Sequence, residues 1–92
     1  MTPEAKVKKK VVAKLKEAKA YFFYPVTGGY GRSGVPDIIA CHGGKFIGIE
    51  CKAGKNKPTA LQEKNLRDIE AAGGIALVIN EDNLDEVEKY LG

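Results

Sequence analysis

Two acids and a lysine interrupt the most strand-like part of the chain, the segment GVPDIIACHGGKFIGIECKAGK at residues 34–55. Asp37 stands at the start of the first apolar run of this segment, and Glu50 and Lys52 close the second run. Carboxylates bind divalent cations, and an ammonium group stabilises charge on a reacting phosphate. These residue types could therefore do chemistry if the fold brings them together.

A Gly43-Gly44 pair separates the two runs, and such a pair between alternating segments predicts a two-residue hairpin turn. With that turn, Asp37 lies directly opposite Glu50, with Cβ atoms about 4.5–5.5 Å apart on one face. Lys52 points to the same face, about 6.6 Å further along the strand. A shift of one residue in the register would remove this opposition.

Two opposed carboxylates repel each other, and either protonation of one acid or a divalent cation relieves the repulsion. Mg²⁺ suits such a site because it is held by one or two carboxylates and keeps waters that substrate phosphate oxygens replace. Lys52 can then act on the attacking water or on the charge of the transition state. Two acids, one lysine and a bound metal together predict hydrolysis of a phosphodiester. The alternative is that Asp37 only starts a strand after Pro36 and Lys52 only pairs with one acid at a sheet end.

The N-terminal segment TPEAKVKKKVVAKLKEAKAY predicts a helix, with Thr2 as N-cap and Pro3 at the first helical position. Glu4 falls within the same arc as the apolar stripe of this helix. An acid in line with a buried stripe predicts a role at the site, and a favourable interaction with the helix dipole is the alternative. The stripe is formed by Val7, Val11, Leu15 and Ala18.

The rest of the chain predicts an α/β domain with the order α-β-β-β-α-β-α, and residues 1–92 form one domain. A helix starts near Thr59 and stops at Gly73-Gly74. The strand IALVI (75–79) is expected to be buried on both faces. The closing helix, NLDEVEKYLG (83–92), places Leu84, Val87 and Leu91 on one side. The other expected strands are 21–26, 36–42 and 45–52.

The composition indicates a globular protein and argues against a membrane-spanning or secreted one. With 43% hydrophobic and 29% charged residues the chain is globular, and no apolar run approaches the length of a membrane span. The lysine-rich N-terminus lacks the apolar core of a secretory signal. Cys41 and Cys51 lie on opposite faces of the expected hairpin and fit a reducing compartment, and with one His they are too few for zinc. We expect a soluble intracellular, cytoplasmic protein, which a virus or prophage could encode.

Charge is distributed unevenly along the chain. Residues 1–57 carry twelve Lys/Arg against four Asp/Glu, whereas residues 58–92 carry three against eight. This asymmetry predicts a basic face and a polyanionic partner such as DNA. A lysine-rich helix that is simply solvated is the alternative.

The order Pro36-Asp37, turn, Glu50-Cys51-Lys52 resembles the PD-(D/E)XK nuclease signature, and the predicted element order is similar to the core of that superfamily. More narrowly, Glu4 in the first helix, GRSGVPD before the acid and PTALQ after the lysine resemble the VRR-NUC (virus-type replication-repair nuclease) domain. The likeness covers about residues 2–80. Ala60 is a departure, because proline is common there.

The resemblance implies a restriction-endonuclease-like fold, with a mixed sheet flanked by helices and an extra C-terminal helix. It implies that Asp37 and Glu50 bind Mg²⁺ or Mn²⁺ together with the backbone carbonyl of Cys51, and that Lys52 acts on the water or the scissile phosphate. Glu4 would reach the metal directly or through water.

The resemblance also places Gln62 beside Lys52 as a positioning member of the catalytic set. The pair Thr59 and Gln62 is equally a capping box, which is the alternative. No organic cofactor is expected.

Residues that we expect to contact DNA lie in the glycine-rich segment and on the basic surface. Tyr30 could stack on a base, and the others could bind phosphate, which would make the affinity fall with salt. Exposed side chains without a ligand are the alternative. The residues expected to bind phosphate are Arg32, Ser33, Lys55, Lys57, Lys6 and Lys10.

The resemblance implies a metal-dependent, structure-selective DNA endonuclease. The leading hypothesis is a homodimeric Holliday-junction resolvase. A symmetric four-way junction needs two cuts, which a two-fold dimer supplies. YFFYPV (21–26) and the closing helix could provide apolar contact surface. The alternatives are a nuclease for flaps, nicks or duplex ends, a non-catalytic nucleic-acid-binding module on the same fold, and a small structural α/β domain.

Overall fold

The computed structural model describes residues 1–26 and 32–92 and has the predicted order of helices and strands. No helix in these two ranges is long and apolar enough to cross a membrane. The elements are α1 (Pro3–Glu17), β1 (Tyr21–Phe23), β2 (Ile38–His42), β3 (Lys45–Cys51), α2 (Ala60–Ala71), β4 (Ile75–Ile79) and α3 (Asp85–Glu88).

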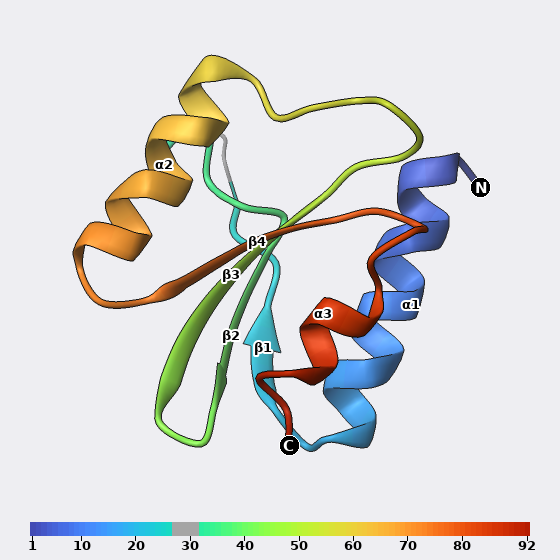
Figure 1. Ribbon diagram of the computed structural model, residues 1–92, viewed down its shortest axis with the longest axis vertical. Helices are drawn as coiled ribbons and strands as arrows, with labels where there is room; N and C mark the ends of the chain where they lie inside the picture. The colour runs from blue at the N-terminus through green and yellow to red at the C-terminus, as the bar shows by residue number, and fades with distance from the viewer. Residues whose placement is uncertain (27–31) are drawn as a thin grey trace.

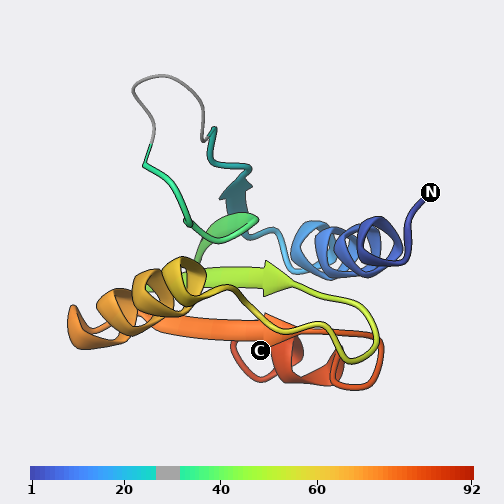
Figure 2. The same cartoon turned by 90° about the horizontal axis from the view of Figure 1, so that it is seen from above.

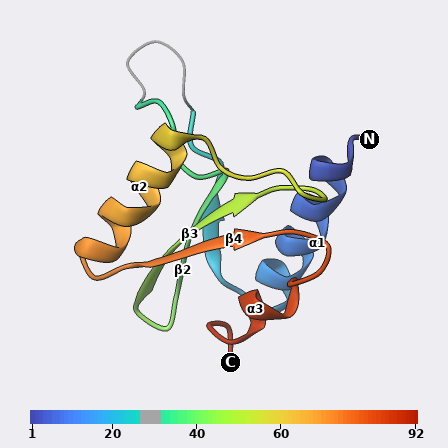
Figure 3. The ribbon, with the colours of Figure 1, turned by 45° about the horizontal axis from the view of Figure 1, so that its top comes forward.

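The strands form one mixed sheet in the order β1-β2-β3-β4. β1, β2 and β3 are antiparallel neighbours, and β4 runs parallel to β3. Figure 2 and Figure 3 show β3 and β4 side by side, with the loop after β3 lying close to the first turns of α1. The predicted α/β class with a mixed sheet and flanking helices is confirmed, and the carboxyl end of β3 faces the start of α1.

The hairpin between β2 and β3 has the predicted turn and register. Gly43 and Gly44 have φ angles of 58° and 77°, and two successive positive φ angles are typical of a type I′ turn. His42 pairs with Lys45, and at the other end of the hairpin Ile38 pairs with Ile49. One residue beyond that last pair, the same register places Asp37 opposite Glu50.

The two faces of the sheet are covered by different helices. Ile38, Ile47 and Ile49 belong to the hydrophobic core, together with Val11 of α1 and Val87 of α3. α2 lies on the other side of the sheet, as Figure 1 shows. α1 and α3 therefore lie on one face of the sheet, and α2 covers part of the other face.

Three strands are shorter than the sequence predicts, and the backbone hydrogen bonding at their ends explains the difference. β1 stops at Phe23, two residues before Pro25, which has no N–H to donate to a ladder. β2 starts only after Asp37, because the Asp37 carboxylate accepts the Cys51 N–H in place of a backbone carbonyl. Lys52 lies beyond the end of β3, and its N–H bonds to Ile79 on the β4 side.

The closing helix is also shorter than predicted. α3 covers four residues and has no side-chain hydrogen bond at its N-cap, and the chain then continues in i to i+3 hydrogen bonds such as Tyr90 N–H to Val87. The predicted sidedness is confirmed, because Val87 is buried and Leu84 and Leu91 pack against the core. The apolar side of this segment is thus used within the protomer.

β4 is buried on one face rather than on both. Leu77 and Ile79 are buried, whereas Ile75, Ala76 and Val78 are half-buried. The reason is the position of β4 at the edge of the sheet, where α2 covers it only in part.

Candidate active site

Glu50 is the most unusual residue of the structure, because a carboxylate at the end of the central strand β3 is 2% exposed. Its Oε2 lies 3.3 Å from Lys52 Nζ, but its Oε1 is buried and has no hydrogen-bond partner among the described residues. Burial raises the pKa of Glu50 to about 7, and the Asp37 carboxylate adds to this, while Lys52 lowers it. An acid in this state costs folding free energy unless something binds it.

Asp37 lies beside Glu50, at the entry to β2. Its Oδ2 accepts a hydrogen bond from the Cys51 N–H at 2.9 Å, and within residues 1–26 and 32–92 no hydrogen bond is made to its other oxygen. In an extended strand the N–H and C=O of one residue point to the same edge, so the Cys51 carbonyl also points toward Asp37. The site therefore offers carboxylate and carbonyl oxygens that converge from two adjacent strands.

Lys52 and Glu4 extend this set toward α1. The Lys52 side chain is 13% exposed, and its Nζ lies 4.0 Å from Glu4 Oε1 as well as close to Glu50. Glu4 reaches this point from the first turn of α1, where Thr2 caps the helix and the buried stripe begins at Val7. This contact agrees with the expected position of Glu4 on the inward arc, and a role for Glu4 at the site stays a prediction.

An open hollow of about 550 Å³ adjoins Glu4. It lies between the start of α1 and the loop that follows β3. Its lining residues are Thr2, Pro3, Glu4, Ala53, Gly54, Lys55 and Asn56.

The donor set fits a hard divalent cation that keeps part of its water shell. Within residues 1–26 and 32–92, no three side chains of His, Cys, Asp or Glu gather closely enough to hold a metal by themselves. Mg²⁺ does not need such a cage, because one or two carboxylates, a carbonyl and substrate oxygens satisfy it. Glu50 Oε1, which has no partner in the described part of the chain, is the atom that such an ion would bind.

Gln62 is engaged in the capping box at the start of α2. Its Oε1 accepts the Thr59 N–H at 2.9 Å, and its own N–H donates to the Thr59 hydroxyl at 3.2 Å. Among the described residues, no hydrogen bond joins it to Lys52. The helix-capping alternative therefore describes the structure, and a role for Gln62 beside Lys52 stays a prediction.

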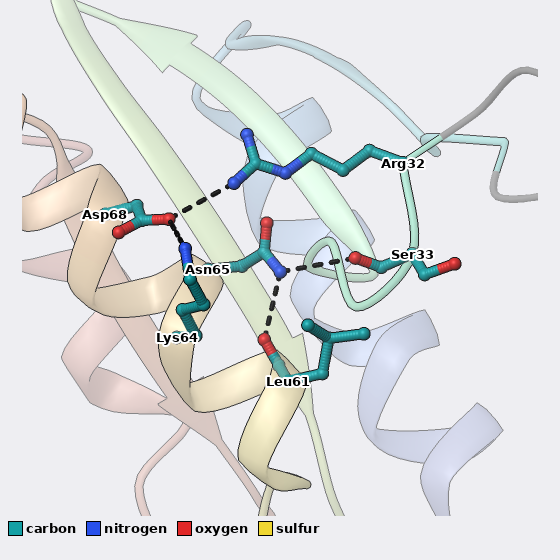
Figure 4. A network of polar contacts seen from close by, with 6 residues as sticks. All are labelled: Arg32, Ser33, Leu61, Lys64, Asn65 and Asp68. Carbon is teal, nitrogen blue, oxygen red and sulfur yellow. Dashed lines mark hydrogen bonds and ion pairs between the residues drawn. The ribbon is translucent and has the colours of Figure 1, made fainter.

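The segment that leads into Asp37 is fastened to α2, as Figure 4 shows. Arg32 donates to Asp68 at 3.1 Å, and Asn65 Nδ2 donates to the carbonyls of Ser33 at 3.3 Å and Leu61 at 2.9 Å. A hydrogen bond from Lys64 lowers the pKa of Asp68, and Arg32 acts in the same direction. Arg32, expected to contact DNA, is thus already paired with an acid.

The other residues expected to contact DNA lie on α1, in the segment before β2 and in the loop after β3. Tyr30 lies outside the described residues. Ser33 is exposed, and its backbone carbonyl rather than its hydroxyl makes the contact with α2. The four predicted lysines are all exposed, two on α1 and two on the loop after β3: Lys6, Lys10, Lys55 and Lys57.

Two residues near the site were not predicted from the sequence. Asn65 is buried and holds the segment before Asp37, but a single polar residue in a helix gives little signal of such a contact. Lys8 is half-buried one turn after Glu4, with its Nζ 4.4 Å from the centre of the Tyr24 ring. The spacing of four residues from Glu4 was the signal that could have identified Lys8.

Comparison with known proteins identifies the family of the chain. The sequence model of the family described as archaeal Holliday junction resolvase (hjc) matches residues 11–79. The chain belongs to this family. The Hjc family is one of the PD-(D/E)XK nucleases, so the broad resemblance is confirmed and the fold agrees with it, whereas the narrower likeness to VRR-NUC stays a prediction. The Hjc match contains Asp37, Glu50 and Lys52 but begins after Glu4.

A phage protein is also similar. "Putative nuclease p44" of Acyrthosiphon pisum secondary endosymbiont phage 1 is 38% identical over 58 residues, which is 62% of this chain and 62% of that protein. The chain therefore spans less than two thirds of the length of the relative that it matches. Both comparisons associate this Hjc-family chain with nucleases.

Proposed function

We propose that this chain is a divalent-metal-dependent DNA endonuclease that cuts branched DNA, with a four-way junction as the preferred substrate. The observation that carries the proposal is the buried Glu50 carboxylate, whose Oε1 has no partner among the described residues, beside Asp37 and Lys52. Membership of the Hjc family supports the junction as substrate. Mg²⁺ or Mn²⁺ suits the oxygen donors.

The proposed roles follow from the positions of the side chains. Asp37, Glu50 and the Cys51 carbonyl would hold the metal, which supplies Lewis-acid activation of water and of the scissile phosphate when it is bound. Lys52, which pairs with Glu50 and Glu4, would orient the attacking water and balance charge on the pentacoordinate transition state. Glu4 would help to hold the Lys52 ammonium, and it borders the open hollow.

We further propose a homodimer, because a symmetric junction requires two cuts. Tyr21 and Phe46 are 71% and 48% exposed and both flank Cys41 on one face of the sheet, since Tyr21 pairs with Cys41 and Cys41 pairs with Phe46. Phe23 is 47% exposed on the same face. Contiguous exposed apolar residues typically mark a protein interface. This aromatic face (Tyr21, Phe23, Cys41 and Phe46) is the surface that a second copy would cover.

The relation to VRR-NUC domains is a narrower part of the proposal. It rests on Glu4, which precedes the Hjc match, and on the PTALQ segment at the start of α2. It predicts that Glu4→Gln lowers the cleavage rate without removing the protein's affinity for DNA.

The test is cleavage of a labelled four-way junction and of a linear duplex with the same arm sequences, in Mg²⁺, Mn²⁺ and EDTA. Glu50→Gln, purified in parallel, controls for contaminating nuclease. We expect paired cuts in the junction, only with a metal, and none with Glu50→Gln.

Other results would identify a different function. Equal cutting of both DNAs would leave a nuclease without junction preference, and cutting of flaps or nicks alone would change the substrate. Tight, salt-dependent binding without cutting in either metal would identify a binding module.

A further inference from the structure

Lys8 lies on the same side of α1 as Glu4, the helix residue that contacts Lys52. It follows Glu4 by four residues, so the two side chains are neighbours on the helix surface. Lys8 is half-buried, whereas Lys6, Lys9 and Lys10 are exposed. Lys8 is therefore in a different environment from these three exposed lysines.

An aromatic ring holds the Lys8 ammonium in place. Its Nζ lies 4.4 Å from the centre of the Tyr24 ring, which is a cation–π contact. The Tyr24 ring meets Phe22 edge to face, with centroids 6.1 Å apart and planes at 66°, and Phe22 packs against the hydrophobic core. The ring is thus anchored to the sheet, and the ammonium lies over its face.

The Lys8 ammonium has no acidic partner. Among the described residues, no carboxylate lies within ion-pair distance of its Nζ, although Glu4 on the same helix pairs with Lys52. A contact with a ring face leaves N–H donors available, and an ammonium carries three of them. A fixed cation with free donors is suited to an anionic ligand.

We propose that Lys8, positioned by the Tyr24 ring, binds a DNA backbone phosphate next to the scissile phosphodiester. This inference rests on the proposed nuclease function and adds a phosphate subsite between α1 and the end of β1. Lys8 contacts the substrate in this scheme, and Tyr24 is a positioning residue. The contact is to the backbone, so it contributes affinity regardless of base sequence.

The experiment measures junction binding in EDTA by fluorescence anisotropy at salt concentrations from about 50 to 200 mM. Lys8→Gln is compared with Lys89→Gln, which removes the same charge from an exposed site at the end of α3. One lost phosphate contact reduces the slope of log K against log salt by about 0.9 and raises Kd roughly five- to tenfold near 100 mM salt. We expect this change for Lys8→Gln only.

Variants of Tyr24 separate positioning from general damage. Tyr24→Phe keeps the ring and should bind like the wild type, whereas Tyr24→Leu should raise Kd although no charge is lost. In cleavage assays Lys8→Gln should raise KM and leave kcat within roughly twofold, because binding rather than the chemical step is weakened. Thermal unfolding of each variant by circular dichroism establishes that it is folded.

The outcomes separate this inference from the proposed function. A wild type that cuts the junction, together with a salt slope for Lys8→Gln equal to that of Lys89→Gln, would overturn the phosphate subsite alone. Equal Kd values for Tyr24→Leu and Tyr24→Phe would overturn the role of the ring. A wild type that neither binds nor cuts DNA would overturn both proposals.

Discussion

Glu50 combines burial with an unsatisfied oxygen, and both properties are costly for the free protein. The carboxylate must lose water to enter the core, and Asp37 repels its charge, so the pKa rises to about 7. Lys52 offsets only part of this, at 3.3 Å from one of the two oxygens. Such groups are typical of functional sites, where stability is lost so that a ligand can be bound.

The stability of the metal-free protein should therefore depend on the charge of Glu50. Between the ordinary pKa of 4.5 and about 7, the folded state binds more protons than the unfolded state, so stability falls as pH rises through this range. Glu50→Gln should remove that loss and be more stable than the wild type at about pH 8, by up to about 3 kcal/mol, with little gain at about pH 5. Urea unfolding in EDTA measures this difference.

Glu17→Gln is the matched control, because Glu17 is exposed at the end of α1. Its stability relative to the wild type should not change with pH in the same way. A Glu50→Gln variant that is less stable than the wild type at about pH 8 would contradict the assignment of Glu50 as an uncompensated acid.

The acids and the lysine could be predicted from the sequence because strand geometry has few alternatives. A Gly43-Gly44 turn fixes the register, and alternation then places Asp37, Glu50 and Lys52 together. The hydrogen bond from the Cys51 N–H to Asp37 and the burial of Glu50 could not be predicted, because both depend on how the helices pack on the sheet.

At the scale of elements, α2 holds the segment that delivers Asp37 to the site. Gly34 has a φ angle of 75°, and a Cβ atom there would lie 2.5 Å from Leu61 Cγ and 3.0 Å from Asn65 Nδ2. The chain passes against α2 at this point and enters β2 four residues later, at Ile38. Asn65 and the close contact at Gly34 together fix the approach to the acid.

Gly34→Ala should therefore disturb both the fold and the site. The backbone strain and the contact with Leu61 each cost on the order of 1–3 kcal/mol. Gly54→Ala is the control, because Gly54 also has a positive φ of 58° but has open space where a Cβ would lie. Urea unfolding should show a larger loss for Gly34→Ala. Equal losses for the two variants would mean that backbone strain alone matters and that α2 does not constrain the segment.

The order and type of the elements were predictable, but several ends were not. Helix starts were correct because Thr2 and Thr59 are local signals that act on the next few residues. Strand ends depend on partners that are distant in the sequence. For example, the Cys51 N–H donates to the Asp37 side chain instead of a backbone carbonyl, and β2 begins only after Asp37. The short α3 has no such start signal, since no side chain caps it.

At the scale of the whole molecule, the helices leave part of the sheet open. α2 packs over the β3 and β4 side, and the aromatic face remains exposed across β1, β2 and β3. Composition predicted a basic half of the chain, but it could not show which apolar residues stay outside the core. YFFYPV was expected to supply contact surface, and Tyr21 and Phe23 are indeed exposed.

The dimer proposal predicts that charge on the aromatic face prevents association. Phe23→Lys should convert a dimer into a monomer in sedimentation velocity, because an ammonium would be buried in an apolar interface. The monomer should remain folded, since Phe23 lies outside the core. Leu61→Lys, at a residue with a similar exposed fraction of 48% on α2, should leave the dimer intact. A wild type that sediments as a monomer would contradict the proposal.

The central claim is that Asp37 and Glu50 form the metal site of a nuclease, and Mn²⁺ binding to the wild type and to Glu50→Gln tests it most directly. Electron paramagnetic resonance of the free ion gives the affinity at about pH 6 and about pH 8. We predict tighter binding by the wild type at the higher pH, because Glu50 must lose a proton whose pKa is about 7. Glu50→Gln should lose at least about tenfold in affinity, the loss that even outer-shell changes cause. Equal affinities for the two proteins, or no change with pH, would contradict the account.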